Sequence, residues 1–254
     1  MLLLSGLGQT HEVWNRVLTR LGRDFRVIAP SDHEGHKGSY LRAREREATH
    51  ALADAAPDGD LTIIGHSIGA YVAAKLAAQM TGGTSSLILL SPAGFGPTPL
   101  LWRLAPLELL LGPSLFAAID HLPAPARSST VWPIYSRIVY REKPSLHHDR
   151  VDDLVQGKLT TRAFLSTAHR LVAELRHHPI EPYLERVSCP IHVIAGRRDA
   201  LAPTYWELFE AVGASRTVLP GCGHCPQMEC PEKLLMALSA LGILTAPSLR
   251  SSQP

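Results

Sequence analysis

The chain has 254 residues, of which 45% are hydrophobic and 19% charged, and its formal net charge is +2. These values describe an ordinary globular protein with enough residues to bury its own core, and they exclude an intrinsically disordered chain. A net charge this small, without any run of Lys or Arg, provides no electrostatic basis for binding nucleic acid.

No membrane span or export signal is predicted. The most apolar stretch, residues 100–119, contains Arg103, Glu108 and two prolines, so it does not qualify as a membrane-spanning helix. Residues 1–4 form too short an apolar run for a secretory signal. The chain has only four cysteines, too few to indicate the disulfide framework of a secreted protein. Together with the missing export signal, this leads us to expect a cytoplasmic protein. The sequence carries no indication of the oligomeric state.

Strands and helices are predicted to alternate over the first 90 residues. Short runs of branched apolar residues predict strands, and helical periodicity or an Ala-rich composition predicts helices. In chain order, we expect strands at 2–4, 26–30, 61–64 and 86–90, separated by helices at 12–21, at 42–55 and from residue 69 onward. This alternation predicts an α/β fold with a mainly parallel sheet and right-handed crossovers.

The pattern changes after residue 96, where prolines divide the chain into helical stretches. We expect a helical cap at 97–186, laid over a core made of 1–96 and 187–245. The cap helices are predicted at 100–111, 114–119, 131–140, 151–159 and 162–177. The last of them carries an apolar stripe of Leu165, Ala168, His169, Val172 and Leu175.

The alternation returns in the last third of the chain. We expect strands at 191–195 and 215–219 and helices at 204–212 and 231–241. Residues 246–254 are polar and unpatterned, and are predicted to form a disordered tail.

Gly65-His66-Ser67-Ile68-Gly69 is a G-x-S-x-G motif between a predicted strand and a predicted helix. This context is the one that a nucleophile elbow requires, because the sharp turn raises the serine hydroxyl above the sheet. The turn forces the serine into a strained backbone conformation, and a Cβ at either glycine would meet the neighbouring strand or helix. The motif is short and also occurs by chance, so the hypothesis needs a base and an acid elsewhere.

Asp199 and His224 supply that acid and base. Each follows a predicted strand, and the carboxyl ends of parallel strands lie at the same edge of a sheet, where ligands bind. A histidine can take the serine proton near neutral pH, and a carboxylate on its other nitrogen fixes its tautomer. The chain order Ser67, Asp199, His224 is the one expected for a nucleophile elbow.

The sequence resembles the α/β-hydrolases that carry a helical cap, a group of carboxylesterases, thioester hydrolases, carbon–carbon bond hydrolases and haloperoxidase-like enzymes. The motifs that carry the resemblance are GHSIG, GRRDALAP, GCGHCPQMECPE and DHEGHKGS. The resemblance implies that Ser67 is the nucleophile, Asp199 the acid and His224 the base. It also implies an oxyanion hole formed by the backbone N–H groups of Leu7 and Ile68, and no metal or organic cofactor.

The chain departs from the family pattern in three places. Ser5-Gly6 stands where the family usually has His-Gly, a change that we expect to alter the support of the oxyanion loop rather than abolish the hole. Ser91 occupies the position at which some relatives carry the acid, which strengthens the assignment of Asp199. The family's sheet usually begins with a hairpin ahead of the strand at 2–4, so we expect the first two strands of the usual fold to be missing here.

Cys222, His224, Cys225 and Cys230 form a C-x-H-C-x4-C pattern. A zinc site usually joins two separated pairs of ligands, so this single cluster is a poor match. We expect no metal, and free cysteines packed near His224.

Side chains that could contact a substrate are few in the sequence. His66 lies beside the predicted nucleophile, and four aromatic residues of the predicted cap could line an acyl pocket, although packing within the cap would explain them equally well. These four are Trp102, Trp132, Tyr135 and Phe164.

These observations predict a serine hydrolase that cleaves a carboxylic ester or thioester of a small-to-medium apolar molecule through an acyl-enzyme on Ser67. Two alternatives stay open. One is a carbon–carbon bond hydrolase or lyase that uses the same triad on an activated ketone. The other is a non-catalytic ligand-binding protein on the same fold.

Overall fold

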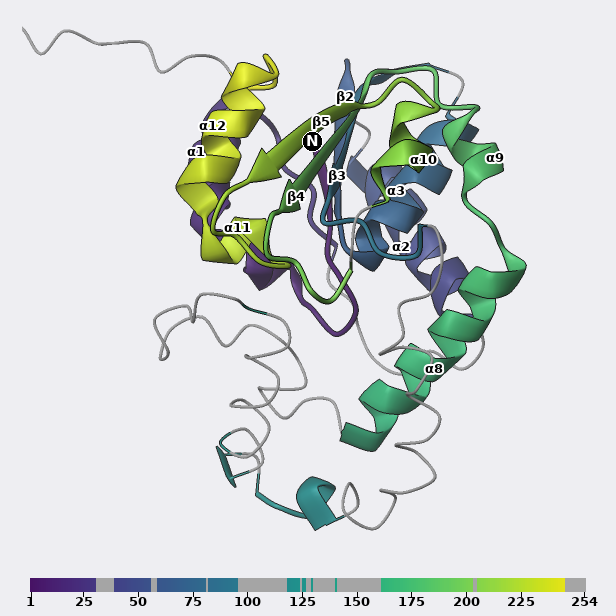
Figure 1. Ribbon diagram of the computed structural model, residues 1–254, viewed down its shortest axis with the longest axis vertical. Coiled ribbons are helices and arrows are strands. Elements are labelled where there is room, and N and C mark those ends of the chain that lie inside the picture. The colour runs from purple at the N-terminus through teal and green to yellow at the C-terminus, as the bar shows by residue number, and fades with distance from the viewer. Residues whose placement is uncertain are drawn as a thin grey trace, which may run out of the picture.

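A parallel sheet with helices on both faces forms the centre of the computed structural model (Figure 1). Its five strands lie in the order β1 (Leu2–Leu4), β2 (Leu61–His66), β3 (Thr84–Leu90), β4 (Ile191–Gly196) and β5 (Ser215–Leu219). Every neighbouring pair is parallel, with one shift of register at Leu61/Thr62. The predicted α/β fold with a parallel sheet is therefore confirmed.

The structure describes residues 1–30, 39–55, 59–80, 82–95, 161–202 and 205–244, with 118–123, 125–126, 129 and 140 as short additions. Most of the cap helices predicted at 100–111, 114–119, 131–140 and 151–159 lies outside these residues. So do most of the DHEGHKGS segment and the tail at 246–254. The division into a core and a cap at 97–186 therefore stays a prediction. Among the described helices, none combines the length and the apolar composition needed to cross a bilayer.

Nine helices have defined bounds within the described part of the chain. They are the 3₁₀ turn η1 (His11–Trp14) and the helices α1 (Asn15–Asp24), α2 (Tyr40–Ala55), α3 (Ile68–Gln79), α8 (Thr161–His177), α9 (Glu181–Leu184), α10 (Trp206–Glu210), α11 (Pro226–Glu229) and α12 (Pro231–Ala240). The helix expected at 12–21 is thus a 3₁₀ turn followed by an α-helix, and the helix expected at 204–212 is shorter.

The strand expected at 26–30 is reduced to a single bridge. Ile28 pairs with Leu2: the N–H of Leu3 donates to the Ile28 carbonyl (2.8 Å), and the N–H of Ile28 donates to the Met1 carbonyl (2.9 Å). Pro30 follows two residues later and has no N–H to continue a ladder. The prediction was correct in position but wrong in extent.

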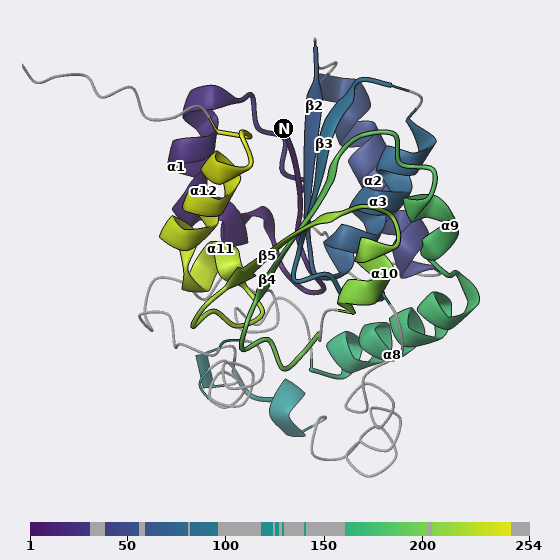
Figure 2. The same ribbon diagram turned by 45° about the horizontal axis from the view of Figure 1, so that its top comes forward.

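Side chains of successive strand residues enter two separate apolar layers, as the two-residue period of a strand requires. Leu3, Ile64 and Ile88 belong to the layer shared with α1, α11 and α12. Leu4 and Ile63 belong to the layer shared with α2, α3, α9 and α10. Figure 2 shows these two groups of helices on opposite sides of the sheet. A sheet covered on both faces explains why the strands are nearly continuous apolar runs.

Helix α8 is docked on the core through Glu174. Its carboxylate accepts hydrogen bonds from the N–H groups of Tyr40 (2.9 Å) and Leu41 (3.1 Å) and from the Ser39 hydroxyl (3.0 Å), which caps the first turn of α2. A carboxylate at a helix N-terminus also interacts favourably with the helix dipole.

The apolar stripe predicted for this helix is shifted. Ala168, Leu171 and Val172 are buried, whereas His169 is exposed. The buried face follows the spacing of 168, 171, 172 and 175, so His169, which was assigned to the stripe, lies on the solvent side.

Replacing Glu174 by Ala should lower the free energy of unfolding by about 1–2 kcal/mol, because two backbone N–H groups at the start of α2 lose their acceptor. The measurement is urea unfolding at pH 7. The exposed Glu185→Ala, just beyond α9, removes the same charge and serves as the control. Equal midpoints for the two variants would contradict the capping role.

Candidate active site

The carboxyl ends of the strands converge on one edge of the sheet. Ser5 follows β1, Ser67 follows β2, and Ser91 follows β3. The loop after β4 is joined to the loop after β5, since the N–H of Arg198 donates to the Cys222 carbonyl (2.9 Å). This edge is where a parallel α/β sheet binds its ligands.

Ser67 sits on a strained turn, as predicted for a nucleophile elbow. Its φ of 54° and ψ of −122° lie in a region that L-residues rarely adopt, at a cost of about 1–3 kcal/mol. Hydrogen bonds on both sides hold it there: its N–H donates to Leu90 (2.9 Å), and its carbonyl accepts from Ala70 (3.0 Å) and Ala93 (3.1 Å).

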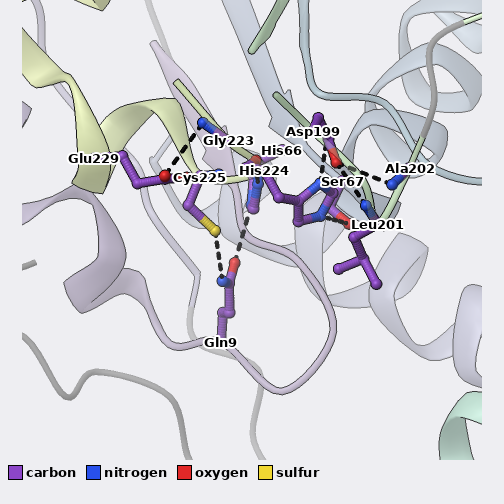
Figure 3. Close-up of polar contacts among 10 residues, drawn as sticks. All are labelled: Gln9, His66, Ser67, Asp199, Leu201, Ala202, Gly223, His224, Cys225 and Glu229. Carbon is purple, nitrogen blue, oxygen red and sulfur yellow. Dashed lines mark hydrogen bonds and ion pairs between the residues drawn. The ribbon is translucent and has the colours of Figure 1, made fainter. Parts of the chain in front are cut away.

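Ser67, His224 and Asp199 form a continuous chain of hydrogen bonds (Figure 3). His224 Nε2 is 2.9 Å from the Ser67 hydroxyl oxygen, and His224 Nδ1 is 2.8 Å from Asp199 Oδ2. The second carboxylate oxygen of Asp199 accepts from the N–H groups of Leu201 and Ala202, both at 3.0 Å. The side chains of His224 and Asp199 are only 4% and 3% exposed.

Asp199 is held in its ionised form. Burial, the largest influence, raises the pKa of a carboxyl group, but His224 and the N–H groups of Leu201 and Ala202 outweigh it, so the pKa of Asp199 lies below its usual value. An ionised Asp199 keeps the His224 ring proton on Nδ1, which leaves Nε2 free to accept the proton of Ser67. The arrangement can therefore activate a serine hydroxyl.

Two backbone N–H groups beside Ser67 are available to an anion. Within the described residues, the N–H groups of Leu7 and Ile68 donate to no backbone acceptor, and Ile68 is the first residue of α3. A Cβ added to Gly6 would come within 3.2 Å of the Ser67 Cβ, so the loop that carries Leu7 lies directly against the elbow. Helix N-termini and unpaired N–H groups stabilise negative charge.

The loop after β1 is firmly held although Ser5 replaces the usual histidine. The buried Ser5 hydroxyl donates to the Thr10 carbonyl (3.2 Å) and accepts from the Trp14 indole (3.1 Å). The buried guanidinium of Arg44 donates to the Ser5 carbonyl (3.2 Å). Ser5 therefore supports this loop through its own hydrogen bonds with Thr10 and Trp14, and through its carbonyl with Arg44.

His66 lies in the core and does not face a substrate. It is fully buried, with Nδ1 2.9 Å from Gln9 Oε1 and Nε2 2.8 Å from the carbonyl oxygen of His224. Burial, together with the nearby His224, lowers the pKa of His66 to about 3, so the ring is neutral and donates to one acceptor at a time. The ring has no exposed surface to offer a substrate, which corrects the prediction that His66 binds one.

The cysteine prediction is wrong for two of the residues. Cys222 and Cys230 form a disulfide bond, with their Cα atoms 6.2 Å apart, while Cys225 keeps a buried thiol outside any disulfide. Sulfur atoms joined in a disulfide cannot serve as thiolate ligands, so this bond and the zinc site considered above exclude one another. Disulfides are most common in oxidising compartments, and the cytoplasmic location stays a prediction.

The aromatic residues predicted to line the pocket belong to the predicted cap, most of which lies outside the described residues. Trp102, Trp132 and Tyr135 lie outside the described residues, and so does the side chain of Phe164 in α8. From the same predicted cap, the buried Tyr140 places its hydroxyl 3.5 Å from the Met228 sulfur in α11. A cap residue that carried no sequence motif therefore contacts the helix just after His224.

Two polar side chains near the site were missed by the sequence analysis. Gln9 is buried and contacts Gly6, His66 and Cys225, and Glu229 accepts from two N–H groups beside His224. Gln9 belongs to none of the motifs quoted above, and Glu229 lies in GCGHCPQMECPE, where only His224 was given a role. Hydrophobic periodicity gives no signal for either residue. The one local signal for Gln9 and Glu229 is that each is a polar residue in an otherwise buried segment.

Comparison with known proteins identifies the family. The sequence model of the alpha/beta hydrolase family matches residues 1–237, and the chain therefore belongs to that family. Pimeloyl-[acyl-carrier protein] methyl ester esterase of Nitrosomonas europaea is 26% identical, over 95% of this chain and 94% of that protein.

Two solved structures share the fold. A thermophilic esterase from Thermogutta terrifontis has a TM-score of 0.69 at 20% identity, covering 96% of this chain and 90% of that one. The 2-hydroxy-6-oxo-6-phenylhexa-2,4-dienoate hydrolase of Rhodococcus has a TM-score of 0.70 at 18% identity, covering 95% and 89%. At these identities the likeness extends to the fold alone, so the reaction has to be argued from the site.

The burial of His66 should make the protein less stable as the pH falls below about 6.5. Below that pH, His66 binds a proton in the unfolded chain but not in the folded chain, where its pKa is about 3. Between pH 7 and pH 5 this group should cost about 2 kcal/mol of unfolding free energy, measured by urea unfolding. His66→Gln should reduce the loss by that amount, whereas the exposed His50→Gln should not. An unchanged loss in His66→Gln would disprove the assignment.

The disulfide should stabilise the protein by about 2–3 kcal/mol, as expected for a short closed loop. The Cys222→Ser/Cys230→Ser double variant should lose this amount in urea unfolding without reductant, while Cys189→Ser controls for loss of a free thiol. Thiol titration of the denatured, unreduced protein should find two thiols, those of Cys189 and Cys225. Four titrated thiols would mean that the bond is absent.

Proposed function

We propose that the protein is a serine hydrolase that cleaves a carboxylic ester or thioester of a small-to-medium apolar molecule. The observation that carries the proposal is the hydrogen-bonded chain from Ser67 through His224 to Asp199 at the ligand-binding edge of the sheet. A serine is a weak nucleophile until a base takes its proton, and this chain provides the base together with the carboxylate that orients it.

In the first half of the reaction, Ser67 Oγ attacks the substrate carbonyl carbon while His224 Nε2 accepts the hydroxyl proton. The ionised Asp199 stabilises the imidazolium that forms. His224 then gives the proton to the departing alcohol or thiol, and the acyl group remains on Ser67. The first transfer joins Ser67 Oγ and His224 Nε2, which already lie within hydrogen-bond distance, so it needs no rearrangement of the three side chains.

The negative oxygen of the tetrahedral intermediate is proposed to lie between the N–H groups of Leu7 and Ile68. These donors are fixed before the reaction begins, so the stabilisation requires no reorganisation, and each is worth about 3–4 kcal/mol in such sites. In the second half, His224 takes a proton from water as the water oxygen attacks the acyl carbon. His224 then returns the proton to Ser67 Oγ as the acyl–oxygen bond breaks and the acid is released.

An apolar substrate is supported by the residues around the nucleophile. Ile68 is buried beside Ser67, and a Cβ added to Gly94 would lie 2.9 Å from Leu175 of α8 and 3.6 Å from Ile68. Apolar side chains of the core and of α8 thus meet next to the serine. The methyl ester esterase of Nitrosomonas europaea supports an ester as the bond that is cleaved.

The purified protein should hydrolyse p-nitrophenyl butyrate, and Ser67→Ala should lower kcat/KM by at least about 10⁴-fold. Asp199→Asn should cost about 10⁴-fold because the wrong His224 tautomer is favoured. A fluorophosphonate should label the wild type but not Ser67→Ala. Ser91→Ala, a serine at the end of the neighbouring strand, is the control and should be labelled.

Three outcomes decide between the candidate functions. Ester turnover with labelling supports the serine hydrolase. Cleavage of an activated diketone without ester turnover would favour a carbon–carbon bond hydrolase. No turnover and no labelling would indicate a binding protein, and the proposal would be rejected.

A further inference from the structure

Glu229 lies at the end of the loop that carries His224, at the last residue of α11 (Figure 3). One of its carboxylate oxygens accepts from the N–H of Cys225 (2.8 Å), and the other accepts from the N–H of Gly223 (3.1 Å). These two residues are the neighbours of His224 in the chain. A single carboxylate therefore binds the N–H groups of the residues on both sides of His224.

His224 is thus held by two carboxylates from opposite sides. Asp199 bonds to its ring at Nδ1, while Glu229 bonds to the backbone that carries the ring. Hydrogen bonds from N–H groups to a carboxylate are charge-assisted and are about twice as strong as those between neutral groups. Asp199 alone cannot fix the direction of Nε2, because the ring can pivot about the Nδ1 contact when the backbone moves.

The other interactions that hold this loop involve different atoms. The disulfide joins Cys222 to Cys230 at the ends of the loop, and His66 contacts the carbonyl of His224. Neither engages the N–H groups of Gly223 or Cys225. Those two donors are buried with their residues, and without Glu229 they would lose an acceptor that water does not readily replace.

We propose that Glu229 is a positioning residue for the reaction, which sets the direction of His224 Nε2 toward Ser67 by binding the backbone N–H groups of Gly223 and Cys225, the residues on either side of His224. This proposal rests on the proposed function for its kinetic consequence. A displacement of about 1 Å between reacting groups can cost 10²-fold in rate, and proton transfer from Ser67 to His224 depends on this alignment.

The kinetic test compares Glu229→Ala and Glu229→Gln with Glu232→Gln, which removes a charge from the exposed side of α12. Glu229→Ala should lower kcat for p-nitrophenyl butyrate by about 10- to 100-fold and leave KM within about twofold. Glu229→Gln retains one acceptor oxygen and should recover part of that loss. The control should match the wild type. A wild-type kcat in Glu229→Ala would overturn the proposal.

A second measurement separates this proposal from the proposed function. The proton between His224 Nδ1 and Asp199 should give a far-downfield proton NMR signal in the wild type and in Glu232→Gln, whether or not the protein hydrolyses esters. Glu229→Ala should shift or broaden this signal, and Glu229→Gln should partly restore it. An unchanged signal in Glu229→Ala would overturn the positioning role, even in a protein without esterase activity.

Circular dichroism and urea unfolding show whether each variant is folded. If Glu229→Ala does not fold, Glu229→Gln decides the matter alone. A folded Glu229→Gln with wild-type kcat and a wild-type signal would contradict the proposal, and a lowered kcat with unchanged KM would support it.

Discussion

The site depends on the close contact between the turn after β2 and the end of β1. Gly69, in the first turn of α3, lies so near that an added Cβ would come within 2.6 Å of the Ser5 carbonyl oxygen. A Cβ on Gly65 would come equally close to the Cα of Ala70. Only glycine permits both approaches, and together they bring the loop of Leu7 beside Ser67. The nucleophile and its neighbouring N–H groups therefore arise from one packing constraint.

The strained conformation of Ser67 is maintained by the surrounding structure. Its N–H donates to Leu90, the last residue of β3, and its carbonyl accepts from Ala70 in α3 and from Ala93 just after β3. The cost of about 1–3 kcal/mol is small beside the apolar burial of a sheet covered on both faces. A rigid sheet edge thus supports one unfavourable backbone conformation at the place where a reactive side chain is required.

The sequence predicted those features that depend on local pattern. Strands β4 and β5 were expected almost at their observed ends because apolar runs bounded by turn residues define them. Ser67, Asp199 and His224 were identified because each follows a strand in an order typical of the family, and the structure brings them together. These are short-range signals, and they locate the candidate site without any knowledge of the packing.

Features that depend on long-range packing were not predicted. The disulfide requires residue 222 to meet residue 230 across α11, and the contacts of Gln9 join residues more than 200 positions apart in the chain. The burial of His66 depends on the same convergence of loops. Neither hydrophobic periodicity nor composition predicts these contacts. For this reason the sequence alone favours substrate binding by His66 and free cysteines near His224.

The neutral state of His66 is a condition for the chemistry proposed for His224. The two rings have centroids 5.0 Å apart. If His66 carried a charge, it would oppose the formation of the His224 imidazolium by about 3 kcal/mol at an effective dielectric constant of 20. That is about a hundredfold against proton transfer from Ser67. Burial removes the charge: among the described residues the ring bonds to the Gln9 side chain and the His224 carbonyl rather than to a carboxylate, and burial lowers the pKa of His66 to about 3. Asp199, equally removed from solvent, stays charged because N–H donors and His224 surround it. The surroundings of Ser67 thus keep one buried group, His66, neutral and another, Asp199, ionised. This is the charge distribution that a histidine base requires.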